Sequence, residues 1–127
     1  MNFMGVIAVG GGAAAGAWLR WGLGIVLNPV FPTLPVGTLA ANLIGGYLMG
    51  IALGVLSHFE SLAPETRLFI TTGFLGGLTT FSTFSAEATT LLSRAQIGWA
   101  ATHVAAHVIG SVALTFAGIA TMRFFLR

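Results

Sequence analysis

Hydroxyl groups and two phenyl rings alternate in the stretch from Thr79 to Ser85 (TTFSTFS), directly after a glycine-rich run. The stretch lies inside a segment long and apolar enough to cross a lipid bilayer. Hydrocarbon penalises every backbone or hydroxyl group that lacks a partner. Polar residues at membrane depth therefore face protein or a wet pathway, and they mark a site.

Phe81 and Phe84 are three residues apart, so they share one face of a helix. The edge of an aromatic ring is positive, and edges turned toward a pathway would attract an anion weakly. The alternative is that both rings pack against lipid or the core. Ser82 and Thr83 lie between them and could donate to the same anion, or bond back to the preceding turn.

Two further segments carry isolated polar residues. Asn42 lies near the middle of an apolar run, and its amide could join two helices or donate to a passing anion. Near the C-terminus, polar side chains recur at every fourth position and so fit within a stripe of about 120° on a helix. This stripe is the wall of a pathway or ordinary tertiary packing, and its members are His103, His107, Ser111 and Thr115.

Charged groups are rare. Glu87 is the one carboxylate inside a predicted membrane segment, and it shares a helix face with Thr83 and Phe84. It is either a proton carrier or an interfacial group. Arg20 stands between two tryptophans, which is typical of an interfacial arginine; its alternative is a positive charge that draws anions into a vestibule.

This polar set is rich in donors, which suits an anion better than a cation. It contains no nucleophile paired with a base and no phosphate-binding loop, so we expect no enzyme activity. The spacing of His103 and His107 could hold zinc, but no well-placed third ligand accompanies them, and the chain has no cysteine. No basic cluster suits a nucleic acid, so we expect no nucleic-acid partner.

The composition places these residues in a membrane. Of the 127 residues, 56% are hydrophobic and 6% charged, against about 25% charged in soluble domains. We predict an all-α integral membrane protein, one domain over 1–127 that contacts membrane lipid. A membrane helix needs about 20 apolar residues, and four transmembrane helices are predicted over about 3–27, 37–56, 66–92 and 98–125.

The third of these segments is predicted to break near Gly76 to Thr80. Glycines lower helical stability by about 1 kcal/mol each, and a β-branched pair follows them. A break exposes carbonyls that hold cations and N–H groups that favour anions. The alternative is a glycine-rich but continuous helix that packs tightly on a neighbour.

Small residues recur four apart on the first two segments and predict close helix approach, either within one subunit or at a dimer face; they are Gly12, Gly16, Gly46, Gly50 and Gly54.

An even number of spans places both termini on one side. The five arginines are then almost evenly divided, with Arg67, Arg123 and Arg127 on that side and Arg20 and Arg94 toward the other. Since this asymmetry sets orientation, we hypothesise that the chain inserts both ways and pairs antiparallel.

Three motifs resemble the Fluc/CrcB fluoride channels of bacteria over essentially the whole chain: GAWLRW at 16–21, GTLAANLIGG at 37–46 and TTGFLGGLTTFSTFS at 71–85. Glu87 and the Gly-Ser pair at 110–111 add to the resemblance. The resemblance implies a passive, fluoride-selective channel in the bacterial inner membrane that exports fluoride ion and lowers its toxicity. It also implies an antiparallel dual-topology homodimer with two pores.

The resemblance further implies a structural Na⁺ at the dimer centre, held by main-chain carbonyls that map to Gly76 and Thr79. The aromatic pore residues map to Phe81 and Phe84, and the pore asparagine to Asn42. The polar track maps to Ser111 and Thr115, with His107 one turn before them, and the vestibule arginine maps to Arg20. No role maps to His103, and the choice of fluoride over chloride comes from the resemblance alone.

Two other functions compete with the channel. A small proton-coupled multidrug-type exporter with four transmembrane helices also inserts with balanced charge, but it needs a titratable carboxylate in its cavity, and only Glu87 is available. A structural subunit that scaffolds a partner is the third possibility.

Overall fold

The computed structural model describes the whole chain, residues 1–127, as helices without strands. Three long helices are α1 (Phe3–Leu27), α2 (Val36–His58) and α6 (Ile97–Phe125). A short 3-10 helix, η1 (Asn28–Val30), continues α1. Each long helix is long and apolar enough to cross a membrane, as the sequence predicts for these segments.

The remaining segment is interrupted, which confirms the predicted break. It consists of α3 (Pro64–Leu68), the π-helix η2 (Phe69–Leu75), α4 (Gly76–Leu78) and α5 (Phe81–Ser93). Thr79 and Thr80 lie between α4 and α5 with extended backbone, at φ −89°, ψ 155° and φ −150°, ψ 118°. Thr80 starts α5, because its hydroxyl accepts the N–H of Thr83 at 3.1 Å.

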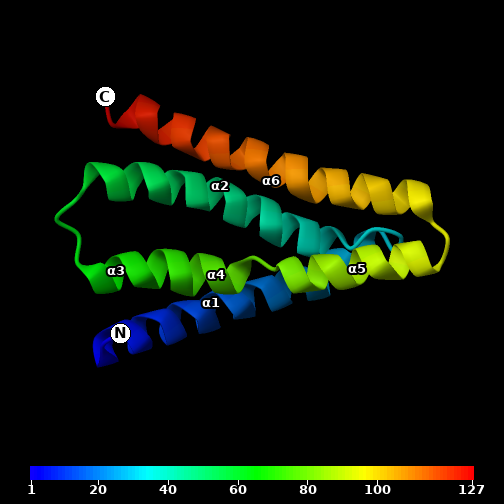
Figure 1. Ribbon diagram of the computed structural model, residues 1–127, viewed down its shortest axis with the longest axis horizontal. Helices are drawn as coiled ribbons and strands as arrows, with labels where there is room; N and C mark the ends of the chain where they lie inside the picture. The colour runs from blue at the N-terminus through cyan, green and yellow to red at the C-terminus, as the bar shows by residue number, and fades with distance from the viewer.

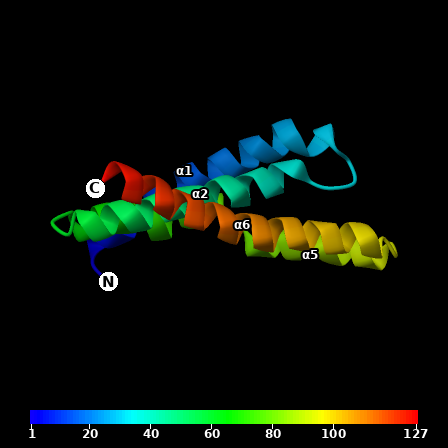
Figure 2. The ribbon, with the colours of Figure 1, turned by 90° about the horizontal axis from the view of Figure 1, so that it is seen from above.

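The helices run side by side in alternating directions, and both termini lie at one end (Figure 1). The longest interfaces join α2 to α6 and α1 to η2 and α4. Seen from above, α5 lies against the first half of α6 (Figure 2). The broken segment therefore has α1 beside its first half and α6 beside its second half.

Close helix approach depends on glycines. A Cβ at Gly12 would lie 2.5 Å from the carbonyl oxygen of Phe69, and one at Gly50 would lie 3.0 Å from the Cα of Gly118. Both spaces are filled by backbone of the same chain. Of the two alternatives, packing within one subunit or a dimer face, the structure shows that these glycines pack within one subunit.

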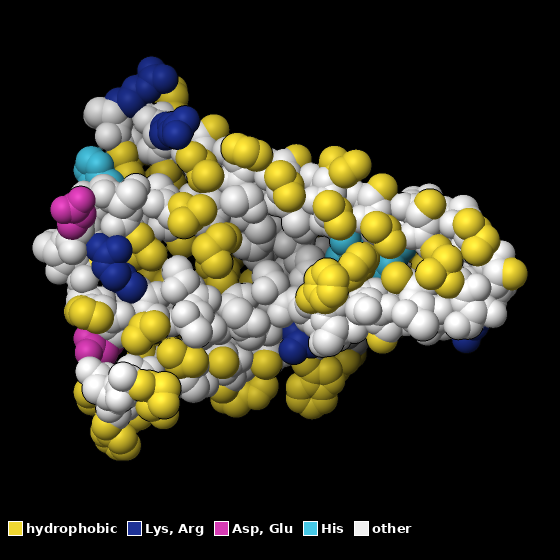
Figure 3. Space-filling view, viewed as in Figure 1, with side chains coloured by type: hydrophobic (Ala, Val, Ile, Leu, Met, Phe, Trp, Pro, Cys, Tyr) yellow, Lys and Arg dark blue, Asp and Glu magenta, His cyan; other side chains and the backbone are white.

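Most apolar side chains point outward. Only 18 of 127 residues are buried, and large side chains such as Ile25, Ile109 and Phe116 are 62 to 68% exposed. Charged side chains gather mainly at the end that carries both termini, while apolar side chains cover the long faces (Figure 3). Such a surface is unfavourable in water and favourable in lipid. The fold is that of a multi-pass membrane protein.

Candidate functional site

A groove of about 410 Å³ runs between α2, α5 and α6, beside the helix break. It brings together most of the residues that the sequence singles out as pore candidates, although they come from separate segments. The predicted residues that line it are Asn42, Thr79, Phe81, Phe84, His107, Ser111 and Thr115. The predicted polar stripe on the last helix therefore faces this groove from His107 onward.

Asn42 forms two hydrogen bonds with the backbone at the helix break. Its side-chain oxygen accepts the backbone N–H of Thr80 at 2.7 Å, and its Nδ2 donates to the Thr80 carbonyl at 3.0 Å. The amide thus replaces the partners that a continuous helix would supply to both groups. The same Nδ2 also donates to Nδ1 of His107, at 3.0 Å. Asn42 therefore joins α2 to the break and to α6, which is the first of the two roles predicted for its amide, that of joining helices.

The two phenylalanines share a face, as predicted, but differ in exposure. Phe81 is 78% exposed at the mouth of the groove, whereas Phe84 is 8% exposed. The Phe84 ring contacts both imidazoles of α6, with ring centroids 5.3 Å from His103 and 4.7 Å from His107. The centroids of Phe81 and Phe84 are 5.5 Å apart. Phe84 is therefore packed within the chain, whereas one chain leaves Phe81 largely uncovered.

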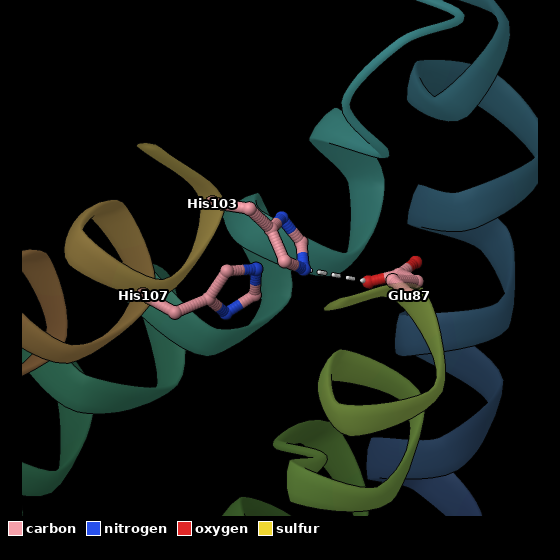
Figure 4. Close-up of side chains that lie close together, drawn as sticks. All are labelled: Glu87, His103 and His107. Carbon is pink, nitrogen blue, oxygen red and sulfur yellow. Dashed lines mark ion pairs between the residues drawn. The ribbon is translucent and has the colours of Figure 1, made fainter. Parts of the chain in front are cut away.

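Glu87 lies on the other side of Phe84. Its Oε2 accepts a hydrogen bond from the Thr38 hydroxyl at 2.7 Å, and its Oε1 lies 3.5 Å from Nε2 of His103 (Figure 4). Glu87 also lines a second groove of about 410 Å³, together with Thr83 and Arg94. The carboxylate therefore contacts α2 and α6 at once, and the side chain remains 15% exposed at the second groove.

Ligand-type atoms of Glu87, His103 and His107 lie within 4.8 Å of one another. The expectation that no third ligand is well placed near the histidines was wrong, because α5 brings Glu87 to them. The sequence separates the carboxylate from the histidines by a turn, and only the packing of α5 on α6 shows their proximity.

Arg20 reaches the break from α1. Its Nε donates to the carbonyl of Gly77 at 3.1 Å, near the C-terminal end of α4, where unpaired carbonyls concentrate negative charge. The flanking Trp18 and Trp21 are exposed. Arg20 therefore points at the broken segment, a contact that neither sequence alternative included.

The remaining predicted residues lie outside the first groove. Ser82 is exposed, with its hydroxyl 3.4 Å from that of Thr80. Gly76 lies in α4, and Thr79, which does line the first groove, follows at the break. The donors that a continuous helix would give their carbonyls are engaged elsewhere, since Thr80 N–H donates to Asn42 and Thr83 N–H donates to the Thr80 hydroxyl.

Sequence reasoning missed Thr38, Thr80 and the contacts of His103. Thr38 lies four residues before Asn42, so both side chains share one face of α2; that spacing could have linked Thr38 to the site. Thr80 lies in the predicted break, and the helix restarts at Phe81 as predicted; only the role of Thr80 as the N-cap was missed, although its residue type fits that position. Nothing in the sequence indicates that His103 meets Glu87.

Long apolar helices, and a groove lined by both polar and apolar side chains beside an interrupted helix, define a multi-pass helical membrane protein with a candidate pathway for small polar species. A family model described as CrcB-like protein, Camphor Resistance (CrcB), matches residues 7–119. The chain belongs to this family, which confirms the resemblance seen in the sequence.

Curated relatives agree with this family. The fluoride-specific ion channel FluC of Nitrosospira multiformis is 57% identical over 123 residues, covering 97% of this chain and 96% of the relative. Proteins of the same name from Aromatoleum aromaticum and Pseudomonas putida are each 56% identical over 119 residues, covering 94% of this chain and 91% and 94% of the relatives.

Proposed function

We propose that this protein is a passive fluoride-specific channel that lets fluoride leave the bacterial cytoplasm and so lowers its toxicity. The observation that carries the proposal is the groove that Phe81, Phe84, Ser111 and Thr115 line together, beside the contact of Asn42 with the helix break. Aromatic edges and the Ser111 hydroxyl can replace part of the water of a small anion at weak positions, as conduction requires. The Thr115 hydroxyl itself donates to the carbonyls of Gly46 and Ser111, at 3.0 and 2.9 Å. Relatives named fluoride-specific ion channel support the choice of anion.

In this proposal the broken segment from α3 to α5, which is third in chain order, also crosses the membrane and brings the number of transmembrane spans to four. Neither half is long enough to cross alone, since a span takes about 20 residues, but the two halves together run from Pro64 to Ser93. The end-to-end course of the segment beside α1 and α6 supports this assignment (Figure 1). The protein then has both termini on one side of the bacterial inner membrane.

The functional unit is an antiparallel dual-topology homodimer with two pores. One chain leaves the groove open along its length, with Phe81 exposed, so lipid would contact the polar lining. A second copy would cover it. The even distribution of the five arginines permits insertion in both orientations, which an antiparallel pair requires.

A structural Na⁺ at the dimer centre would be held by the carbonyls of Gly76 and Thr79. The helix break supports this assignment. The N–H groups that a continuous helix would direct at these two carbonyls, those of Thr80 and Thr83, donate to other acceptors. Carbonyls at a helix break are the ligands with which membrane proteins hold Na⁺. The ion would supply positive charge where two chains bring their α4 C-termini together.

Efflux from liposomes tests the proposal. The purified protein is reconstituted alone into vesicles loaded with fluoride or chloride, and release is followed with ion-selective electrodes without a proton gradient. We expect rapid fluoride release and chloride release no faster than from empty vesicles. If fluoride release requires a proton gradient, the exporter is favoured. If the vesicles release no fluoride, the channel is rejected and the scaffold is favoured.

A further inference from the structure

The Asn42 side chain has a fixed orientation. A swap of its oxygen and nitrogen would place two N–H groups against each other at Thr80 and two oxygens at the Thr80 carbonyl, so both hydrogen bonds to Thr80 would be lost. Nδ2, which has hydrogens and no lone pair to offer, therefore faces His107. The 3.0 Å contact between Nδ2 and Nδ1 of His107 can form in one direction only.

This direction decides the tautomer of His107. Nδ1 accepts the hydrogen bond and carries no proton, so the neutral ring carries its proton on Nε2. His107 is 4% exposed, and its Nε2 has no hydrogen-bond partner. The ring therefore presents a buried donor that the protein itself leaves unsatisfied, and such a group calls for a bound partner.

The surroundings of this donor favour an acceptor over a metal ion. Oε1 of Glu87 and Nε2 of His103, which lie 3.5 Å apart, are also buried without hydrogen-bond partners, and the ligand-type atoms of the three side chains lie within 4.8 Å of one another (Figure 4). A metal would need a lone pair on every ligand, and Nε2 of His107 has none while Asn42 donates to Nδ1. A hydrogen-bond acceptor needs no lone pair from Nε2 of His107, so this tautomer suits an acceptor and not a metal ion.

The position of the cluster joins the two grooves. His107 and Phe84 line the first groove, and Glu87 lines the second. Phe84 packs on both imidazoles. The buried donor therefore belongs to a cluster that contributes residues to both grooves.

We propose that Asn42 is a positioning residue: held by Thr80, it fixes the tautomer of His107 whose Nε2–H donates to fluoride between the two grooves. This inference rests on the proposed function for its ligand, and on the structure alone for the tautomer. Asn42 acts through His107 and does not donate to the anion directly, because its two Nδ2 hydrogens already donate to the Thr80 carbonyl and to Nδ1 of His107.

Nitrogen NMR tests the tautomer without any measurement of transport. Protein labelled with ¹⁵N in its three histidines is reconstituted in lipid, and the His107 signals are assigned by their loss in His107→Gln. We expect a protonated Nε2 and a bare Nδ1 at neutral pH, and a mixture of tautomers in Asn42→Ala. A protonated Nδ1 in the wild type would overturn the inference.

Fluoride efflux from liposomes tests the donor with a matched pair of variants. The amide nitrogen of His107→Gln reaches the position of Nε2, whereas that of His107→Asn reaches only the position of Nδ1. We expect the glutamine variant to keep most of the flux and the asparagine variant to lose about tenfold, the cost of one hydrogen bond to an ion. Equal flux in both variants would contradict the inference.

A double-mutant cycle separates positioning from direct donation. Asn42→Ala should lower flux when residue 107 is histidine, and by a clearly smaller factor in the His107→Gln background, where no tautomer needs fixing. The same factor in both backgrounds would show that Asn42 acts independently of His107. If wild-type vesicles retain fluoride, the proposed function fails, and the NMR result still decides the tautomer.

Discussion

Replacement of Gly16 by alanine should push α1 away from the broken segment. A Cβ at this position would lie 2.6 Å from the backbone nitrogen of Leu78 and 3.0 Å from the carbonyl carbon of Gly77. Nonbonded heavy atoms prefer separations of about 3.5–4.0 Å, so the two backbones must move apart by about 1 Å. The carbonyl oxygen of Phe74 also clashes, and all three atoms belong to backbone, so no side-chain rotation relieves the contact.

Gly10→Ala is the matched control on the same helix. Nothing lies within 4 Å of a Cβ at Gly10, and both substitutions gain the same helix propensity of about 1 kcal/mol. The difference between the two variants therefore isolates the steric term. Overpacking of this kind costs about 1–3 kcal/mol, so Gly16→Ala should be less stable than Gly10→Ala by that amount.

The assay is the free energy of unfolding in mixed detergent micelles, followed by circular dichroism during a denaturant titration. Fluoride efflux should also fall in Gly16→Ala, because the displaced backbone includes Gly77, whose carbonyl accepts the hydrogen bond from Arg20. Equal unfolding free energies for the two alanine variants would refute the reasoning that α1 and α4 are in backbone contact.

Three other substitutions and one change of buffer test the site. Thr38→Val keeps the shape of the side chain but removes the donor to Glu87, so we expect a loss of about 1–3 kcal/mol in unfolding free energy; unchanged stability would contradict this hydrogen bond. Phe81→Ile should lower fluoride efflux by about tenfold or more, if the ring edge replaces part of the ion's hydration, while Phe124→Ile, at the exposed end of α6, keeps wild-type efflux; equal rates would count against the aromatic role. Glu87→Gln should still conduct without a proton gradient, and a gradient-dependent flux that this variant abolishes would favour the exporter. Preparation in strictly Na⁺-free buffer should abolish efflux, and full activity there would reject the cation site.

Much of the fold could be predicted from the sequence because the bilayer restricts the choices. Long apolar runs must form helices in lipid, and α1, α2 and α6 end within about two residues of the predicted boundaries. The break was predictable because Gly76, Gly77 and the pair Thr79-Thr80 weaken the helix at one place. The irregular turn that precedes it, the π-helix η2, was not predicted, because its backbone register has no signature in residue type.

The sequence predicted most residues of the candidate site, but it did not predict how side chains from different helices contact one another. Positions that face one side of one helix, such as His107, Ser111 and Thr115, follow from spacing alone, and they do share a groove. Contacts between helices do not follow from spacing. The meeting of Glu87 with His103, and of Arg20 with Gly77, depends on how each helix is rotated and shifted against its neighbour.

Residue types and their periodicity thus determined which segments enter the membrane, where one of them breaks and which side chains are available as donors. Tertiary packing alone decided how those donors are used. The Asn42 amide could serve an anion or another helix, and only the approach of α2 to Thr80 and His107 commits its Nδ2 hydrogens to protein acceptors. The reason is that a hydrogen bond depends on distance and direction in three dimensions, whereas a sequence records only order along the chain.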